Sequence, residues 1–277
     1  MSLSINTNIA AIDAYNNLNS TSNALDKTIS QLSSGLQIQT AADNASGFVI
    51  SQDLQVQSNG LNVSINNGQN AVSVLQVADG AMNQQTAILQ RMNQLATQAA
   101  NSGTMSTTAY TAVNSEYQAL STQLNQIANS TSYGSATNTL LNGSVSNLTF
   151  QLGAYSSSVD VVAVTLSATT VGALNLITSS VASLTFATQA MASVQAAIDS
   201  ISSIQGSLGA AQNQIQADIA NLTVTQQNVQ SANSTLVDAN MAQTMTTFTS
   251  QQILMQAGTA MLGQAQQLPA MLLKLIP

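Results

Sequence analysis

The sequence predicts a mainly α-helical protein, with a long antiparallel helical bundle formed by both chain ends and a small β-hairpin region in the middle. Apolar residues recur every three, four or seven positions along most of the 277 residues, which is the period of one helix face. This period is lost between about 131 and 184, where β-branched residues and turn signals gather. A hydrophobic content of 44% is ordinary for a folded chain, so disorder is excluded.

The amino-terminal part predicts three helices. The first carries a stripe of aliphatic residues and comes to an end near Gly35, the stripe being Ile5, Ile9, Ile12, Leu18, Leu25, Ile29, Leu32 and Leu36. A second, longer pattern runs from Leu54 to Leu89, with Gly68 at a missing step, until Asn101-Ser102-Gly103 breaks it. A shorter helix follows from about Val113 to Ile127.

The middle region predicts short strands. Asn142-Gly143 has the composition of a hairpin turn, and Val159 to Leu166 is rich in β-branched residues. The same region is the richest in Ser and Thr, so a partly ordered surface loop is the competing interpretation.

The helical period returns from about 188 to 236. Six aliphatic residues are seven positions apart, namely Ile201, Leu208, Ile215, Leu222, Val229 and Leu236. Asp218 and Thr225 interrupt the complementary seam, which favours a shared bundle over a two-stranded coiled coil. A continuous helix of this span is about 70 Å long at a rise of 1.5 Å per residue, so it needs packing partners along its length.

The stripe changes face at two places. After 236 the apolar pattern moves to Met241, Met245, Phe248, Leu254, Ala257 and Met261, and Pro269 is expected to break the tail. We expect joints near 37–47 and 237–243. They divide the chain into a terminal helical coiled-coil inner domain, 1–42 plus 238–277, and a helical bundle domain, 43–237, with the β-rich segment at about 131–184.

Composition excludes several classes of function. Only 5% of residues are charged, against roughly 25% in ordinary domains, and the three cations Lys27, Arg91 and Lys274 are far apart. Without a basic patch we expect no nucleic acid partner. The chain has no Cys or His and no Trp, and its carboxylates are solitary, so we expect neither a catalytic site nor a metal or cofactor.

No transmembrane segment is predicted, because the densest apolar run, Leu268 to Ile276, is too short to span a bilayer. An amphipathic membrane-active tail beside Lys274 is the alternative, but one cation is a weak anchor, and protein contact explains the run better. Residues 1–8 lack the features of a secretory signal peptide. We expect export by another route, without a cleaved signal peptide.

Several motifs lie near the two ends of the chain. The amino-terminal ones are Ile5 to Asn8, Gln31 to Ile38, Ala41 to Gly47 and Gln90 to Asn101, and the carboxyl-terminal one is Gln252 to Ala265 followed by Pro269. Together they resemble the terminal motifs of bacterial flagellin. Where the family usually carries Arg or Glu, this chain has amides at Gln31, Gln37, Asn93 and Gln94. Gln151 to Ala154 is similar to the segment that closes the amino-terminal part of the family's inner domain, so the chain resembles a short form that lacks the outer variable domains.

The resemblance implies a structural subunit that polymerises into the extracellular flagellar filament and serves motility. Its implied partners are further copies of itself, the flagellar export apparatus, an export chaperone holding about Gln252 to Leu275, and the hook-associated and cap proteins, with no nucleic acid or membrane. The resemblance and the terminal stripes predict subunit packing by Ile5, Ile9, Ile12, Leu25, Ile29, Leu32, Leu36, Ile253, Leu254, Ala257, Met261 and Leu262. Family members are recognised by a vertebrate immune receptor at positions that match Gln90, Arg91, Leu95 and Glu116, for which packing and ion pairing inside the polymer is the alternative. O-linked sugars on Ser156 to Ser158 are a further expectation.

Two other functions stay open at this point. A hook–filament junction protein shares the terminal motifs without forming long polymers, and a pore-forming helical toxin would use the apolar tail. The low charge also suggests a filament from an acid habitat, because amide contacts do not titrate near pH 3, whereas carboxylates with a pKa of about 3.9 do. Compositional drift is the alternative explanation.

Overall fold

A computed structural model of the chain describes residues 8–103, 105–134, 137–154 and 160–273, with the backbone alone in 268–273. The chain forms two compact units. One comprises Met1–Val56 and Asn228–Pro277, and the other comprises Gln57–Gln227.

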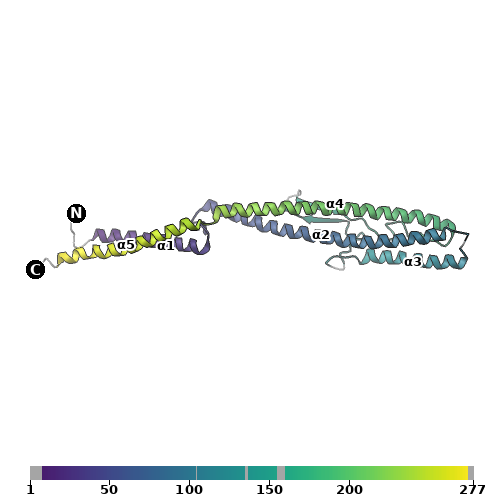
Figure 1. The fold of residues 1–277 in the computed structure, drawn as a ribbon, viewed down its shortest axis with the longest axis horizontal. Coiled ribbons are helices and arrows are strands. Elements are labelled where there is room, and N and C mark those ends of the chain that lie inside the picture. Colours follow the sequence, from purple (N-terminus) through teal and green to yellow (C-terminus); the bar gives the residue numbers. More distant parts are fainter. Residues whose placement is uncertain (1–7, 104, 135–136, 155–159, 274–277) are drawn as a thin grey trace. The chain divides into compact units, whose positions relative to one another are not determined.

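The described residues are mainly helical (Figure 1). In chain order the elements are α1 (Ile9–Ser34), α2 (Ala45–Ala99), α3 (Thr107–Ser130), β1 (Asn147–Gln151), β2 (Val161–Thr165), α4 (Leu184–Val237) and α5 (Met241–Leu273). The predicted fold class is therefore confirmed, including the helical pairing of the chain ends and the small antiparallel sheet between them.

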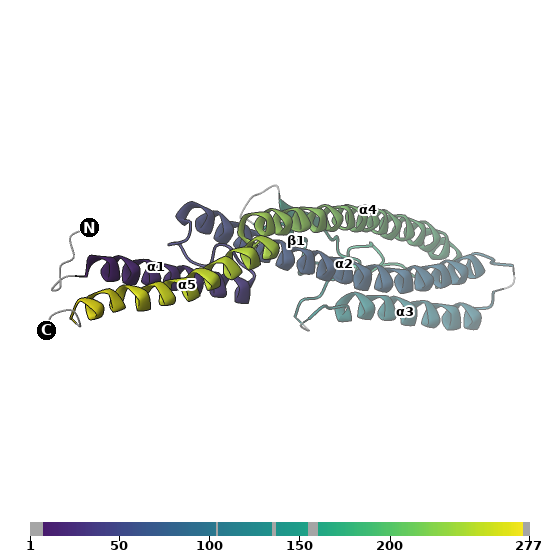
Figure 2. The same cartoon turned by 60° about the vertical axis from the view of Figure 1, so that its left-hand side comes forward.

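The second unit holds a continuous apolar core between α2, α3 and α4 (Figure 2). The heptad stripe of α4 faces this core, since Ile201, Leu208 and Ile215 are almost completely buried. The two long helices run antiparallel: Gly68 of α2 lies against Ile219 of α4, whereas Asp79, further along α2, accepts a hydrogen bond from Gln205, which comes earlier in α4. Burial of the stripe on one face explains why the heptad repeat is sustained.

The sheet pairs β1 with β2 from Asn147 opposite Thr165 to Gln151 opposite Val161. Val162 and Val164 point into the core and alternate with exposed residues, as a half-buried strand requires. The prediction of strands is thus confirmed, but Asn142-Gly143 does not form the turn between them. That dipeptide makes a local turn before β1, with Gly143 at a φ of +88° and the Asn142 side chain accepting from the Ser144 amide. The partner of each strand is decided by which residues the core buries, and a turn motif such as Asn142-Gly143 carries no information about that burial.

The segment after β1 crosses α2 at two glycines. A Cβ on Gly60 would lie 2.8 Å from the Ala154 Cβ, and a Cβ on Gly68 would lie 3.3 Å from Leu152 Cδ2. Gly68 interrupts the apolar stripe of α2 because Leu152 and Ile219 of α4 approach the helix backbone there, which leaves no room for a side chain.

The helices break at both predicted joints. α1 ends at Ser34, because Gly35 adopts the left-handed conformation at a φ of +73° and donates its amide to Gln31. α2 then begins at Ala45, where Asn44 Oδ1 accepts from the Gly47 amide. On the carboxyl side, α4 ends at Val237 and α5 begins at Met241.

The expectation that Pro269 breaks the tail is wrong, because α5 continues to Leu273. A proline inside a helix has no backbone N–H and leaves the carbonyl four residues earlier without its helical donor. That carbonyl belongs to Ala265, and it accepts a hydrogen bond from Asn8 Nδ2 at 2.8 Å. A donor from a distant part of the chain thus compensates for the missing one.

Candidate functional site: the paired terminal helices

The first unit is built on an antiparallel pair of helices, α1 with α5, which we call the terminal pair (Figures 1 and 2). Contacts along its length set one register: Asn8 bonds to Ala265, Leu18 packs on Gly258, and Thr28 Oγ1 donates to Gln251 Oε1 at 2.7 Å. Since these contacts are apolar or between neutral groups, the register does not depend on charge.

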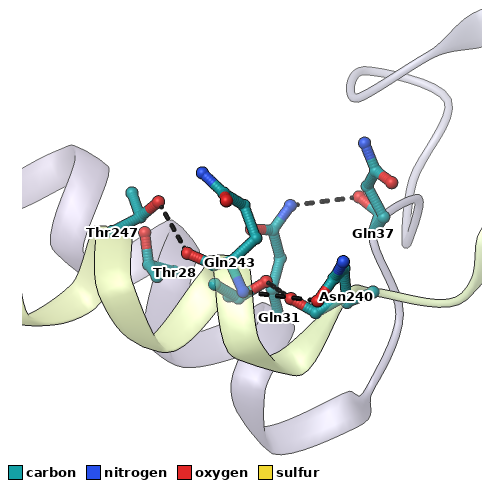
Figure 3. A pocket seen from close by; sticks show the side chains of 8 residues that line it. Thr28, Gln31, Gln37, Asn240, Gln243 and Thr247 are labelled. Atoms are coloured by element: carbon teal, nitrogen blue, oxygen red, sulfur yellow. Dashed lines mark hydrogen bonds between the residues drawn. The ribbon is translucent and has the colours of Figure 1, made fainter.

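Backbone hydrogen bonds close the terminal pair at the joints. The Gln37 amide donates to the Val237 carbonyl at 2.6 Å, and the Ala239 amide donates to the Gly35 carbonyl at 2.8 Å. Beside them is a hollow of about 210 Å³, lined by Thr28, Gln31, Gln37, Ala239, Asn240, Gln243, Thr244 and Thr247. Figure 3 shows amide and hydroxyl side chains around the hollow, and the hydrogen bonds among the lining residues join a side chain to a backbone atom. Such a hollow can accept neutral hydrogen-bonding groups.

The turn that follows α1 is held by an ion pair. Lys27 Nζ lies 2.8 Å from Asp43 Oδ1, and Asp43 Oδ2 accepts from the amides of Gln39 and Thr40. The Lys27 ammonium, followed by these two amides, lowers the pKa of Asp43 from 3.8 to about 2. Asn44 Oδ1 accepts from the Gly47 amide and caps α2, while Asp43 holds the preceding turn.

The structure divides the predicted packing residues into two groups. Leu25 is buried against α5, and Leu32, Leu36 and Leu262 are half-buried. The rest that can be described remain exposed in a single copy, namely Ile9, Ile12, Ile29, Ile253, Leu254, Ala257 and Met261. Ile5 and the predicted sugar acceptors Ser156 to Ser158 lie outside the described residues, as do the side chains of the apolar tail.

The predicted set of packing residues left out three further exposed apolar residues of the terminal helices. Tyr15 is 59% exposed, and Met241 and Met245 are each nearly half exposed, although all three are large and apolar. Their exposure could not be found from periodicity. Asn8 is of a residue type that commonly caps helices, but the predicted stripe already began at Ile5, so the sequence did not locate the cap there.

The residues predicted to meet an immune receptor lie in the second unit. Arg91 of α2 pairs with Glu116 of α3 at 2.6 Å, and both side chains are about half exposed. Gln90 is exposed, but Leu95 is only 1% exposed and belongs to the core. The ion pair links two helices within the chain, and receptor contact remains a prediction.

Within the described ranges, no group of three or more His, Cys, Asp or Glu residues could hold a metal ion. Nor does any described helix have the length and apolarity required to cross a membrane.

Comparison with known proteins identifies the family. A model of the bacterial flagellin N-terminal helical region matches residues 5–146, and a model of the C-terminal helical region matches residues 191–276. The chain belongs to the bacterial flagellin family. A flagellin of Halalkalibacterium halodurans is 34% identical over 275 residues, which cover 98% of this chain and 99% of that protein.

Other flagellins are similar over part of their length. Flagellin D of Vibrio cholerae is 45% identical over 154 residues, or 56% of this chain and 40% of that protein. The chain thus spans about two fifths of the length of the Vibrio flagellins that it matches. A crystal structure of Bacillus cereus flagellin aligns at 24% identity with a TM-score of 0.49, over 57% of this chain and 88% of that chain.

Family membership confirms the resemblance seen in the sequence. Flagellins are the filament subunits of the bacterial flagellum and are structural proteins, not enzymes, so the predicted class of function is also confirmed. The two matched regions include both helices of the terminal pair, all of α2 and α3, and most of α4.

Proposed function

We propose that this chain polymerises into the flagellar filament through the exposed apolar face of its terminal pair. The observation that supports this most is the exposure of large aliphatic side chains there: Ile9, Ile253 and Met261 are each about two thirds exposed in a single copy. Large apolar side chains left exposed in such number favour a protein contact. Burying one such side chain contributes roughly 1.5–3 kcal/mol, so several buried together hold a polymer.

The two parts of the chain that the joints separate have different proposed roles. Residues 1–42 and 238–277 would form the inner layer of the filament, and 43–237 would form the bundle domain. The bundle part carries a core of its own, whereas the terminal helices complete theirs only against further copies. This difference supports a subunit whose ends assemble and whose middle folds independently.

Seeded elongation of the purified full-length chain, followed by electron microscopy, tests the proposal. We expect Ile253→Ser to raise the critical concentration for elongation by about tenfold, the equivalent of about 1.4 kcal/mol of lost apolar burial. Ile177→Ser is the matched control, because Ile177 is 73% exposed but lies in the second unit. Equal effects of the two variants, or no elongation of the unaltered chain, would contradict the assembly role of the terminal pair.

A hook–filament junction protein is the second candidate, favoured by the same terminal motifs. Such a protein would coat seeds with a short layer and stop. Filament length that keeps growing with added subunit distinguishes the filament subunit from it, as does abundance in filaments sheared from cells.

The same surface suggests the other partners. Exposed residues of α5, such as Ile253 and Leu254, have to be covered before assembly, which is what an export chaperone bound at about Gln252 to Leu275 would do for a subunit delivered by the flagellar export apparatus. At the ends of a helical polymer the faces that bind neighbouring subunits stay open, and hook-associated and cap proteins would occupy them. Loss of chaperone binding on truncation of 252–277, with retention on truncation of 1–20, is the expected result of a pull-down assay.

We also propose that assembly changes little between pH 3 and pH 7. Contacts across the terminal pair are apolar or between neutral groups, and the pKa of Asp43, in the ion pair with Lys27 that holds the joint, lies near 2. Filaments reassembled at pH 7 should therefore persist when brought to pH 3. Dissolution at pH 3 would exclude adaptation to an acid habitat.

A further inference from the structure

Asn8 stands out because the two polar atoms of its side chain serve two different helices. Its Oδ1 accepts from the Ala11 amide at 3.1 Å and so caps the N-terminus of α1. Its Nδ2 donates to the Ala265 carbonyl of α5 at 2.8 Å. The two bonds join residues that are 257 positions apart in the chain.

The acceptor on α5 is not an arbitrary carbonyl. In an unbroken helix the Ala265 carbonyl would accept from the amide of residue 269, but that residue is Pro269 and has no N–H. The carbonyl is therefore available to a donor from outside α5. An unpaired carbonyl in a partly buried seam costs free energy, so the donor from Asn8 has a defined place to bind.

We propose that Asn8 is a positioning residue that fixes the register of the terminal pair by filling the acceptor that Pro269 leaves open. In an α-helix most backbone carbonyls are occupied, so a sliding neighbour finds few places to donate. The carbonyls of the last turn are open in any helix, but within the interior of α5 the carbonyl that Pro269 leaves open marks one position. The cap on α1 in turn holds the amide of Asn8 in a fixed orientation, with its Nδ2 toward α5.

Asparagine is the residue that meets both needs. Aspartate can cap a helix but has no N–H to donate when ionised, and serine can cap but is too short to reach a second helix. The link lies at the outer end of the terminal pair, whereas the backbone bonds at Gly35 and Gln37 hold the other end. Register would thus be fixed at both ends of the same pair.

The inference rests on the proposed function, because register matters where the apolar faces of α1 and α5 are presented together to further copies. It can be tested separately from assembly. The chain has no cysteine, and a Cβ on Gly258 would lie 3.9 Å from Leu18 Cβ, which is within the range that a disulfide spans. Leu18→Cys with Gly258→Cys therefore forms a reporter of register in the full-length chain.

The experiment measures the rate of disulfide formation in this reporter under a mild oxidant. Asn8→Ser, which keeps an N-cap and adds no charge, should slow the reaction about fivefold, as expected for the loss of one hydrogen bond. Asn16→Ser is the matched control, because Asn16 is exposed on the same helix, and it should leave the rate unchanged.

The decisive arm combines Asn8→Ser with Pro269→Ala. Alanine at 269 restores the N–H, so the Ala265 carbonyl regains its helical partner and the serine substitution should then change the rate less than twofold. The inference is overturned if Asn8→Ser slows the reaction equally with proline and with alanine at 269, because Asn8 would then act only as a helix cap. Failure of the unaltered chain to form filaments would instead count against the proposed function. The effect of Asn8→Ser on the rate of disulfide formation could still be measured in that case.

Discussion

Residues 57–227 bury a continuous apolar core, whereas the terminal helices leave many of their large aliphatic side chains in solvent. In the second unit Leu75, Met82 and Leu89 are fully buried between α2 and its neighbours. In the terminal pair Leu25 is buried, but Ile12 and Leu254 are more than half exposed. Both regions have the same helical period, so the difference lies in what covers the apolar face.

Under the proposed function, this difference means that one helical pattern serves two purposes. A face covered inside the chain stabilises the fold of one copy, and a face left open supplies free energy to assembly. Substitutions that reduce apolar burial should therefore lower stability in the second unit and lower assembly in the first.

The largest effect is expected for Leu89→Ala. Leu89 is completely buried, so truncation removes apolar contacts and leaves a cavity, at a cost of about 2–5 kcal/mol in the free energy of unfolding. Urea unfolding of the unassembled chain measures it. Leu254→Ala is the matched control, since Leu254 is 56% exposed, and a change within about 0.5 kcal/mol is expected there. Equal destabilisation by both would remove the distinction between the two regions.

Glycines of α2 offer a second comparison. A Cβ on Gly68 would lie 2.7 Å from Ile219 Cγ1, so Gly68→Ala should force the helices apart and destabilise the chain by about 1–3 kcal/mol. Gly80 has no heavy atom within 4 Å of such a Cβ, and Gly80→Ala should stabilise the same helix by up to about 1 kcal/mol. Thermal unfolding of the two variants should shift in opposite directions, and a shift in the same direction would contradict the close approach of α2 and α4.

Asp43→Asn tests the joint after α1 through its pH dependence. Because the folded-state pKa of Asp43 is lowered from 3.8 to about 2, its ionised form stabilises the turn above pH 3.8, and this contribution is lost as the pH falls through 2. Hydrogen exchange at the Gln39 and Thr40 amides, which donate to Asp43, should be faster in the variant at pH 5. The difference between the two proteins should narrow steadily toward pH 2, and a constant difference would rule out the carboxylate charge as its cause.

The smallest effect is expected at the ion pair between α2 and α3. Arg91 Nη2 lies 2.6 Å from Glu116 Oε1, but both side chains are about half exposed, so solvent screens the charges. Arg91→Gln should therefore lower the free energy of unfolding by at most about 1 kcal/mol. Chemical unfolding at low and at high salt measures this cost, which should shrink with salt. A loss as large as that of Leu89→Ala would show that this surface pair holds the bundle as strongly as the core does.

Local signals predicted most of the fold. Gly35 and the change of stripe after Leu236 located the joints because helix termination depends on neighbouring residues. The two errors, at Asn142-Gly143 and at Pro269, have a common cause. In each case a distant segment decided the outcome: the buried valines of β2 in the first and the amide of Asn8 in the second.

The sequence by itself determined that the chain is helical, where its terminal helices end, and which family motifs lie near its ends. Periodicity, helix-ending residues and motifs are local properties of the sequence. Only the tertiary structure decided which apolar residues stay open. Leu25 and Ile29 share one stripe, yet Leu25 is buried and Ile29 is 46% exposed. Residues four positions apart differ by about 40° around a helix of 3.6 residues per turn, and the neighbouring helix covers only part of the stripe.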